Sequence, residues 1–165
     1  MDNFALEEVA ELLEQENQAL EHLTMMQLEN TAKDFEPYPF QLKFIEAGKE
    51  YRARNLMAAN QIGKTRGTAY EVYCHLTGDY PDNWTGFKFD RPITAWGLGV
   101  SNEQLHDVMQ RHLFGNLQKG SDVFHPDQTV PPFIRNDQIE RIERNNQIPG
   151  LVKNVYVKHL SLIHI

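Results

Sequence analysis

The stretch from residue 56 to residue 78, "LMAANQIGKTRGTAYEVYCHLTG", constrains the fold more than any other part of the sequence. A short apolar run at 56–59 comes directly before a loop that contains Gly63, Lys64 and Thr65. After the loop, apolar residues recur at helical spacing up to Gly78, a typical helix stop. We therefore expect a short buried strand, a loop and a helix in direct succession.

The loop matches part of a nucleotide-binding pattern, G-x-x-x-x-G-K-[ST]. Gly63, Lys64 and Thr65 satisfy its last three positions, whereas Ala58 stands where the first glycine belongs. Alanine is tolerable there if it still belongs to the strand, which needs no left-handed backbone. Backbone N–H groups of residues 61–65 would then converge on phosphate oxygens, with Lys64 at the β- and γ-phosphates and the Thr65 hydroxyl on Mg²⁺. The alternative is a chance match, because the tripeptide is short.

Residues 1–36 form an acidic segment with ten Asp and Glu residues against one base, Lys33, and a net charge of −9. The rest of the chain holds 13 acids and 15 bases, so its charge neither indicates nor excludes a nucleic-acid partner. Apolar residues at helical spacing from about residue 4 to 28 predict an amphipathic helix or a helical hairpin, which either packs on the surface or docks another subunit. Pro37 and Pro39 forbid regular helix and predict an extended connection to the body.

Beyond the connection, the pattern continues as alternating helices and strands. A short helix is expected at about 41–51, a second strand at 93–101, and a helix capped by Ser101 over 102–114 that closes at Gly115. A polar segment at 136–145 has helical potential, and the alternation at 151–159 predicts a third strand. This order favours an α/β sandwich with an open sheet.

Several residue types carry no functional signal. No apolar run is long enough for a membrane span, and the acidic N-terminus does not fit a signal peptide. The single cysteine, Cys74, is interpreted as a buried structural thiol in an intracellular chain. Three histidines and two pairs of carboxylates are interpreted as packing or solvated residues: His106, His112, His125, Asp122 with Asp127, and Glu140 with Glu143.

Three segments together resemble the ATPase domain of bacteriophage terminase large subunits. "AANQIGKT" resembles that family's deviant Walker A loop, in which the first glycine is often replaced. "HLTGDYPDNW" and "AWGLGVSNEQLHDVMQ" resemble family landmarks of greater specificity. The resemblance runs from about Phe35 to His159 and implies a P-loop NTPase-type three-layer α/β sandwich, incomplete in this chain and preceded by the acidic helical segment.

The resemblance also implies a nucleotide site. Gln41 in "YPFQ" matches the family's adenine-recognition glutamine, since its amide offers both a donor and an acceptor. Many members carry an arginine in the loop where Asn60 stands here, so that role is left open between Arg66, Arg52, Arg54 and a neighbouring subunit. The residues expected to bind the nucleotide are Gln41, Ala59, Asn60, Gln61, Ile62, Gly63, Lys64, Thr65 and Arg66, with Lys64 as the catalytic residue and Thr65 on the metal.

For the intact protein, the resemblance implies a Mg²⁺-dependent ATPase that drives double-stranded DNA into a procapsid and cuts it with a C-terminal nuclease. The implied partners are the small terminase subunit, the portal protein and further copies of the same chain, in the cytoplasm of an infected bacterium and without a membrane. The second carboxylate motif, the catalytic glutamate and the nuclease are expected beyond residue 159. We therefore divide the chain into an acidic segment (1–36), a partial ATPase domain (37–159) and a non-native tail (160–165).

Two other functions fit parts of the sequence. A helicase with a glutamine motif would share Gln41 and the loop but not the "HLTGDYPDNW" landmark, and no nuclease would follow it. A non-catalytic interaction module would use the acidic helix and keep a vestigial loop, so it would show no affinity for Mg-ATP.

Overall fold

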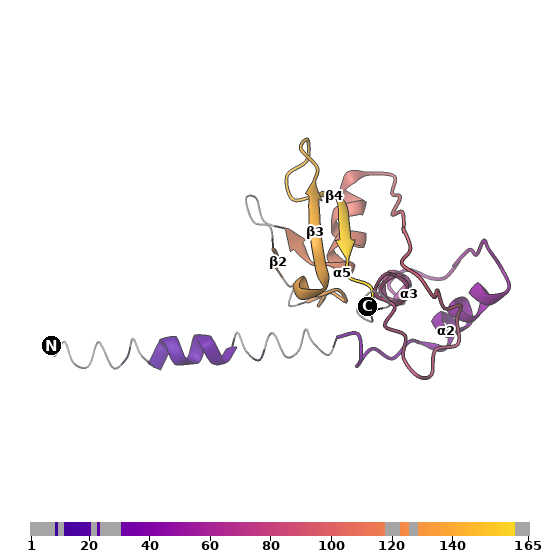
Figure 1. Ribbon diagram of the computed structural model, residues 1–165, viewed down its shortest axis with the longest axis horizontal. Helices are drawn as coiled ribbons and strands as arrows, with labels where there is room; N and C mark the ends of the chain where they lie inside the picture. Colours follow the sequence, from indigo (N-terminus) through magenta and orange to yellow (C-terminus); the bar gives the residue numbers. More distant parts are fainter. Residues whose placement is uncertain are drawn as a thin grey trace.

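The computed structural model describes residues 9, 12–20, 23, 31–117, 123–125 and 129–160. In its N-terminal part, residues 12–20 are helical and stand away from the rest of the chain (Figure 1). Leu12, Leu13 and Leu20 each expose more than half of their surface. The predicted amphipathic helix is thus confirmed for these residues, with its apolar face uncovered, and its expected ends near 4 and 28 lie outside the described residues.

The body is organised around α3, Lys64–Thr77, which lies between α2, Pro39–Glu46, and the C-terminal half of the chain (Figure 1). Gly78 ends α3 in the left-handed conformation, with φ 75°, as the sequence predicts. α2 continues into the 3-10 turn η1, Ala47–Lys49. It begins at Pro39, two residues earlier than predicted, because the first helical position needs no N–H donor. The expectation that Pro39 excludes helix was therefore wrong.

A second helical stretch runs through α4 (Asn102–Gln104), the π-helical η2 (Leu105–Gln110) and α5 (Arg111–Leu113). The Ser101 hydroxyl accepts a hydrogen bond from the N–H of Gln104 at 3.2 Å, so the predicted cap is confirmed. Gly115 follows the helix with φ 94°. The helix over 102–114 was thus predicted, whereas its π-helical middle was not.

The two sheets in the described part of the chain are small and antiparallel. β1 (Asn116–Leu117) pairs with β2 (Phe124–His125), and β3 (Ile139–Arg144) pairs with β4 (Val152–Val157) after the 3-10 turn η3 (Asn136–Gln138). β4 confirms the strand predicted at 151–159.

The helix expected at 136–145 was wrong, because β3 occupies that segment. Ile139 and Ile142 are three residues apart, a helical spacing. The register of β3 shifts between Ile139 and Arg141, a β-bulge, and both isoleucines pack against the core. An extra residue in the strand imitates helical periodicity, since it breaks the usual alternation of faces.

The strands expected at 56–59 and 93–101 were also wrong, since neither segment forms a strand. Met57, Trp96, Leu98 and Val100 are each more than 80% exposed. A buried strand needs neighbouring strands to pair its backbone groups, and neither sheet of the described residues extends alongside these segments. The three-layer sandwich inferred from the family resemblance stays a prediction.

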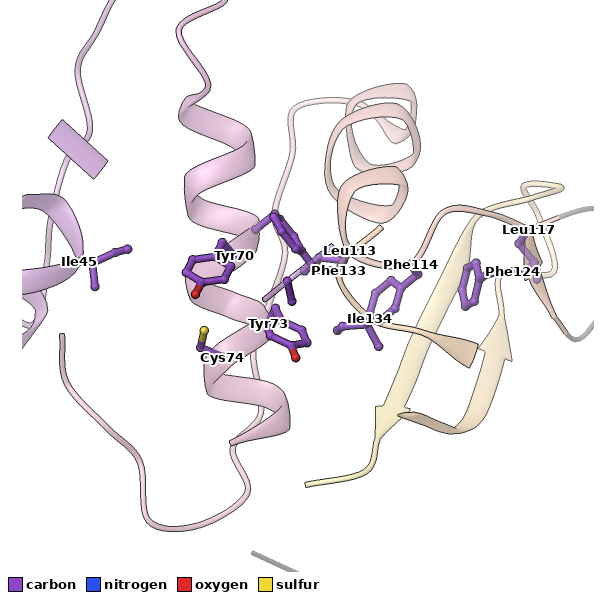
Figure 2. Close-up of a cluster of buried hydrophobic side chains, with 12 residues drawn as sticks. Ile45, Tyr70, Tyr73, Cys74, Leu113, Phe114, Leu117, Phe124, Phe133 and Ile134 are labelled. Atoms are coloured by element: carbon purple, nitrogen blue, oxygen red, sulfur yellow. The ribbon is translucent and has the colours of Figure 1, made fainter. Parts of the chain in front are cut away.

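The core joins α3 to the C-terminal half. Figure 2 shows its side chains running from Tyr70 and Tyr73 on α3 through Phe133 and Ile134 to Phe114 and Phe124. Phe133 and Ile134 are each 1% exposed, and their backbone N–H groups donate to carbonyl oxygens of His112 and Leu113. Cys74 is fully buried in this core, which raises the pKa of its thiol to about 12. It is a structural thiol, as predicted.

Candidate nucleotide-binding site

The predicted loop lies directly before the N-terminus of α3. Gln61 and Gly63 both have positive φ angles, 62° and 86°, and Gly63 is the last residue before the helix. Such left-handed residues turn successive backbone N–H groups toward one side, a geometry typical of anion-binding loops. These two backbone conformations are compatible with an anion-binding loop, whereas the expected strand does not precede it.

Lys64 bridges the base of this loop. Its ammonium Nζ donates to the carbonyl oxygens of Ala58 and Ala59, each at 2.6 Å. Both acceptors are neutral carbonyls at an exposed site, so a phosphate oxygen could replace them and gain the attraction between opposite charges. Thr65 lies at the second position of α3, the position that the Mg²⁺ hypothesis requires. Among the described residues, no three His, Cys, Asp or Glu side chains cluster as a metal site.

Gln41, 22 residues ahead of Gly63 in sequence, is brought directly onto the loop. Its side-chain Nε2 donates to the Gly63 carbonyl oxygen at 2.7 Å, and its Oε1 accepts from the N–H of Tyr38 at 2.7 Å. The residue is 2% exposed, and a Cβ atom added at Gly67 would lie only 2.7 Å from its amide carbon. Gln41 thus fixes α2 against the loop, while its role in adenine recognition stays a prediction.

A cavity of about 680 Å³ opens between the loop and the start of α2. Its size falls within the range of small-molecule sites. Tyr38 and Phe40 present nearly parallel rings, with centroids 6.1 Å apart, and Tyr38 is 60% exposed. The cavity is lined by Phe35, Glu36, Tyr38, Pro39, Phe40, Gln41, Gln61, Ile62, Gly63 and Arg66. Aromatic side chains at such a place are of a kind that can stack on a nucleobase.

Two of the arginines considered for the γ-phosphate have structural partners instead. The guanidinium of Arg66 lies 3.7 Å from the centroid of the Phe133 ring and donates to the Pro131 carbonyl oxygen at 2.6 Å. Burial lowers the pKa of Arg66 to about 10, so the group stays charged at neutral pH. Arg54 pairs with Glu71 at 2.9 Å, whereas Arg52 is exposed. Arg66 therefore lines the cavity with its charged end turned into the body.

The sequence reasoning missed Tyr38 and Phe40 as cavity residues. Both precede Gln41 in "YPFQ", and two aromatic residues just ahead of that glutamine are the signal that could have identified them. The sequence also contained no sign that Glu71 on α3 is buried, because it looks like an ordinary surface carboxylate there.

The other polar residues considered from the sequence lie away from this cavity. The Glu143 carboxylate accepts hydrogen bonds from Asn154 and Tyr156 on the exposed β3–β4 hairpin, which lowers its pKa. His106 contacts Asp107 at 2.6 Å on the surface of η2. Asp122 and Asp127 lie outside the described residues.

Comparison with known proteins agrees with the resemblance found in the sequence. The family described as the N-terminal part of terminase large subunits of the T4-like virus type matches residues 55–145, which include the loop and α3. The terminase large subunit of Salmonella phage P22 is 33% identical over 175 aligned residues, which cover 96% of this chain and 32% of the P22 protein.

The chain thus spans about a third of the length of that relative. No solved structure matches. No helix in the described part of the chain is long and apolar enough to cross a membrane. Because the family model matches more than half of its residues, the chain belongs to the family of phage terminase large subunits and corresponds to the N-terminal part of such a protein.

Proposed function

We propose that this chain is the ATP-binding portion of a viral DNA-packaging motor. The observation that carries the proposal is Lys64, whose ammonium group bridges the base of a loop, while residues 61–63 of the same loop line a cavity with aromatic walls. The P-loop NTPase sandwich is proposed for the intact protein, in which further elements would cover segments 56–59 and 93–101. Exposed apolar side chains in both segments support that part of the proposal.

In this proposal the residues of the site divide the work. Lys64 exchanges its two carbonyl partners for the β- and γ-phosphates, and the backbone N–H groups of residues 61–65 surround the phosphates. The Thr65 hydroxyl would hold Mg²⁺, which neutralises charge that develops on the phosphates. Tyr38 and Phe40 would contact the base, and Gln41 would read its edge. The general base that activates water would come from elsewhere in the intact protein.

The wider biological role follows from the family. In the intact protein, ATP hydrolysis would drive double-stranded DNA into a procapsid in the cytoplasm of an infected bacterium, and a nuclease domain would cut the DNA. Copies of the chain would assemble with the small terminase subunit and the portal protein. The P22 relative is named as a terminase large subunit, which supports this part of the proposal.

Nucleotide titration of the 165-residue chain tests the proposal. With a fluorescent ATP analogue and Mg²⁺, we expect saturable binding with a Kd of about 10–1,000 μM that unlabelled ATP competes away. We expect no phosphate release, because loss of a positioned general base forfeits about 10²- to 10⁴-fold in rate. Absence of saturable binding would favour the interaction module with a vestigial loop, and Mg²⁺-dependent turnover would show that the missing catalytic groups lie within this chain.

The acidic helix is proposed to bind a partner subunit rather than to support the body. Residues 1–30 contain eight Asp and Glu residues and no Lys or Arg, and the described leucines of the helix are exposed. Ala32, in contrast, is 9% exposed and packs with the core, so a deletion should stop before it.

Deleting residues 1–30 should leave the body folded and its nucleotide affinity within twofold of the parent chain, because the residues of this segment that the structure describes, 9, 12–20 and 23, are all exposed. The same deletion in the packaging subunit should weaken its association with the small subunit at least tenfold, as measured by analytical ultracentrifugation. A matched variant that replaces Leu12, Leu13 and Leu20 with serine measures the contribution of the apolar face to this association separately from that of the charge. Unchanged association in both variants, or loss of the fold in the deletion, would contradict the proposal.

A further inference from the structure

An ion pair with a buried carboxylate joins α3 to the segment that precedes the loop. The Glu71 carboxylate on α3 is only 8% exposed as a side chain, and its Oε1 lies 2.9 Å from Nη1 of Arg54. A carboxylate in such a place is stable only when a cation and hydrogen-bond donors compensate for its lost hydration. Arg54 stands four residues before Ala58, where the loop begins. The pair therefore attaches the segment that leads into the loop to the helix that leaves it.

Arg54 also contacts α2, the third segment of the site besides the loop and α3. Its Nη1 donates to the Phe44 carbonyl oxygen of α2 at 2.6 Å, and its guanidinium carbon lies 4.5 Å from the centroid of the Phe44 ring. A Cβ added at Gly48 would lie 3.1 Å from the same Nη1, so the backbone packs closely around it. One guanidinium thus contacts α2, which carries Gln41, and α3, which carries Lys64.

On the far side of Glu71, the network continues into the "HLTGDYPDNW" motif, for which the loop chemistry gives no role. His75 Nε2 lies 3.6 Å from Glu71 Oε1, and its Nδ1 lies 3.0 Å from the hydroxyl of Tyr80. Tyr80 in turn accepts a hydrogen bond from the N–H of Phe89. The His75 ring meets Trp84 edge-to-face. Residues of the motif therefore pack around His75 and hold it beside Glu71.

We propose that Arg54 is a positioning residue for nucleotide binding, which acts through its ion pair with Glu71 on the loop that holds Lys64. The inference rests on the proposed function of that loop. Residues 55–59 have no strand partners in the described part of the chain, so side-chain contacts must fix their path. Glu71 lies seven residues after Lys64, or about 10 Å along a rigid helix, and provides a fixed anchor. Without Arg54, the segment that leads into the loop would lose its attachment to α2 and α3, and the backbone of the loop would no longer be held in one conformation.

The test compares Arg54→Met, which keeps the apolar stem and removes the guanidinium, with Arg91→Met, the same change at an exposed arginine outside the network. Each chain is assayed at least about 15 °C below its own Tm, so that loss of fold is not scored as loss of function. Arg54→Met should raise the Kd for the ATP analogue about tenfold or more, and Arg91→Met should leave it within twofold. Arg54→Lys should recover part of the affinity, since it restores the charge but not the planar fork.

Glu71→Met and the double variant Arg54→Met with Glu71→Met complete a mutant cycle. If the two residues act as one pair, the double variant should bind the ATP analogue no more weakly than Arg54→Met alone, because Glu71 has already lost its partner in that single variant. Additive losses would overturn the proposed route through Glu71. A lower Tm with unchanged affinity in Arg54→Met would reduce Arg54 to a structural residue and overturn the proposal.

A second readout separates this inference from the proposed function. Amide hydrogen exchange of residues 55–63, measured without nucleotide, should be at least tenfold faster in Arg54→Met than in Arg91→Met. If the parent chain binds no ATP, the proposed function fails, while the exchange rates still decide whether Arg54 orders the loop. Equal exchange in both variants would overturn the inference even if the parent chain binds ATP.

Discussion

Replacing Lys64 with alanine should lower ATP turnover of the packaging subunit that carries this sequence by about a thousandfold or more. The reason is that the Lys64 ammonium lies at the base of the loop, 2.6 Å from each of two loop carbonyls that phosphate oxygens would replace. Removing a preorganised charge from a phosphoryl-transfer site typically costs several kcal/mol of transition-state stabilisation. The 165-residue chain should show the same loss as a Kd for Mg-ATP raised at least tenfold.

The fold should survive the change. Lys64 makes its two hydrogen bonds at an exposed site and contributes no side chain to the core, and alanine is a strong helix former. Lys49→Ala, at an exposed lysine that ends η1, is the matched control and should change neither affinity nor turnover by more than twofold. Turnover retained in Lys64→Ala with unchanged circular dichroism would contradict the assignment of the loop.

The sequence predicted the helices well because their signals are local. α3 begins at Lys64 and ends before Gly78, as expected, since a glycine stop and a helical stripe act within one turn. The Ser101 cap was likewise predicted, because it depends on one hydroxyl and an N–H three residues later. The π-helical middle of that helix has no comparably local signal.

The strands were predicted less well because their stability depends on distant partners. The run at 56–59 has the apolar composition of a buried strand, yet Met57 is 84% exposed where no neighbouring strand pairs with it. β3 was mistaken for a helix because a bulge places Ile139 and Ile142 on one side. Pairing partners and bulges are tertiary facts, which a periodicity count over one segment does not contain.

For the site, the family resemblance supplied a long-range relation that local patterns lack. Gln41 and Gly63 are 22 residues apart, and the structure joins them by a hydrogen bond of 2.7 Å. The contribution of Arg66 was not foreseeable, because whether a loop arginine faces a phosphate or an aromatic core depends on where Phe133 packs. The role of such a residue is set by its tertiary neighbours rather than by its place in the motif.

Phe133 is the residue at which loss of packing should destabilise the protein most. Its ring is 1% exposed and packs against Tyr70, Tyr73 and Phe35, with centroid distances of 5.5, 6.1 and 5.3 Å. The Arg66 guanidinium also lies on it, at 3.7 Å from the centroid. Phe133→Ala should therefore lower the free energy of unfolding by about 3–5 kcal/mol, because it opens a cavity and removes the nearer of the two aromatic rings beside the partly buried Arg66 guanidinium.

Urea unfolding followed by circular dichroism measures the effect, and Phe87→Ala, at a half-exposed ring, is the control with an expected loss below about 1 kcal/mol. Since a loss of 3–5 kcal/mol is a large share of the stability of a small domain, Phe133→Ala could be unfolded even without urea. Phe133→Leu keeps much of the apolar volume and removes the aromatic face, so it should cost about 1–2 kcal/mol and remain measurable. Equal stability of Phe133→Leu and the parent chain would show that the contact between this ring and Arg66 does not stabilise the fold, and the guanidinium would then be held by its hydrogen bond to the Pro131 carbonyl oxygen.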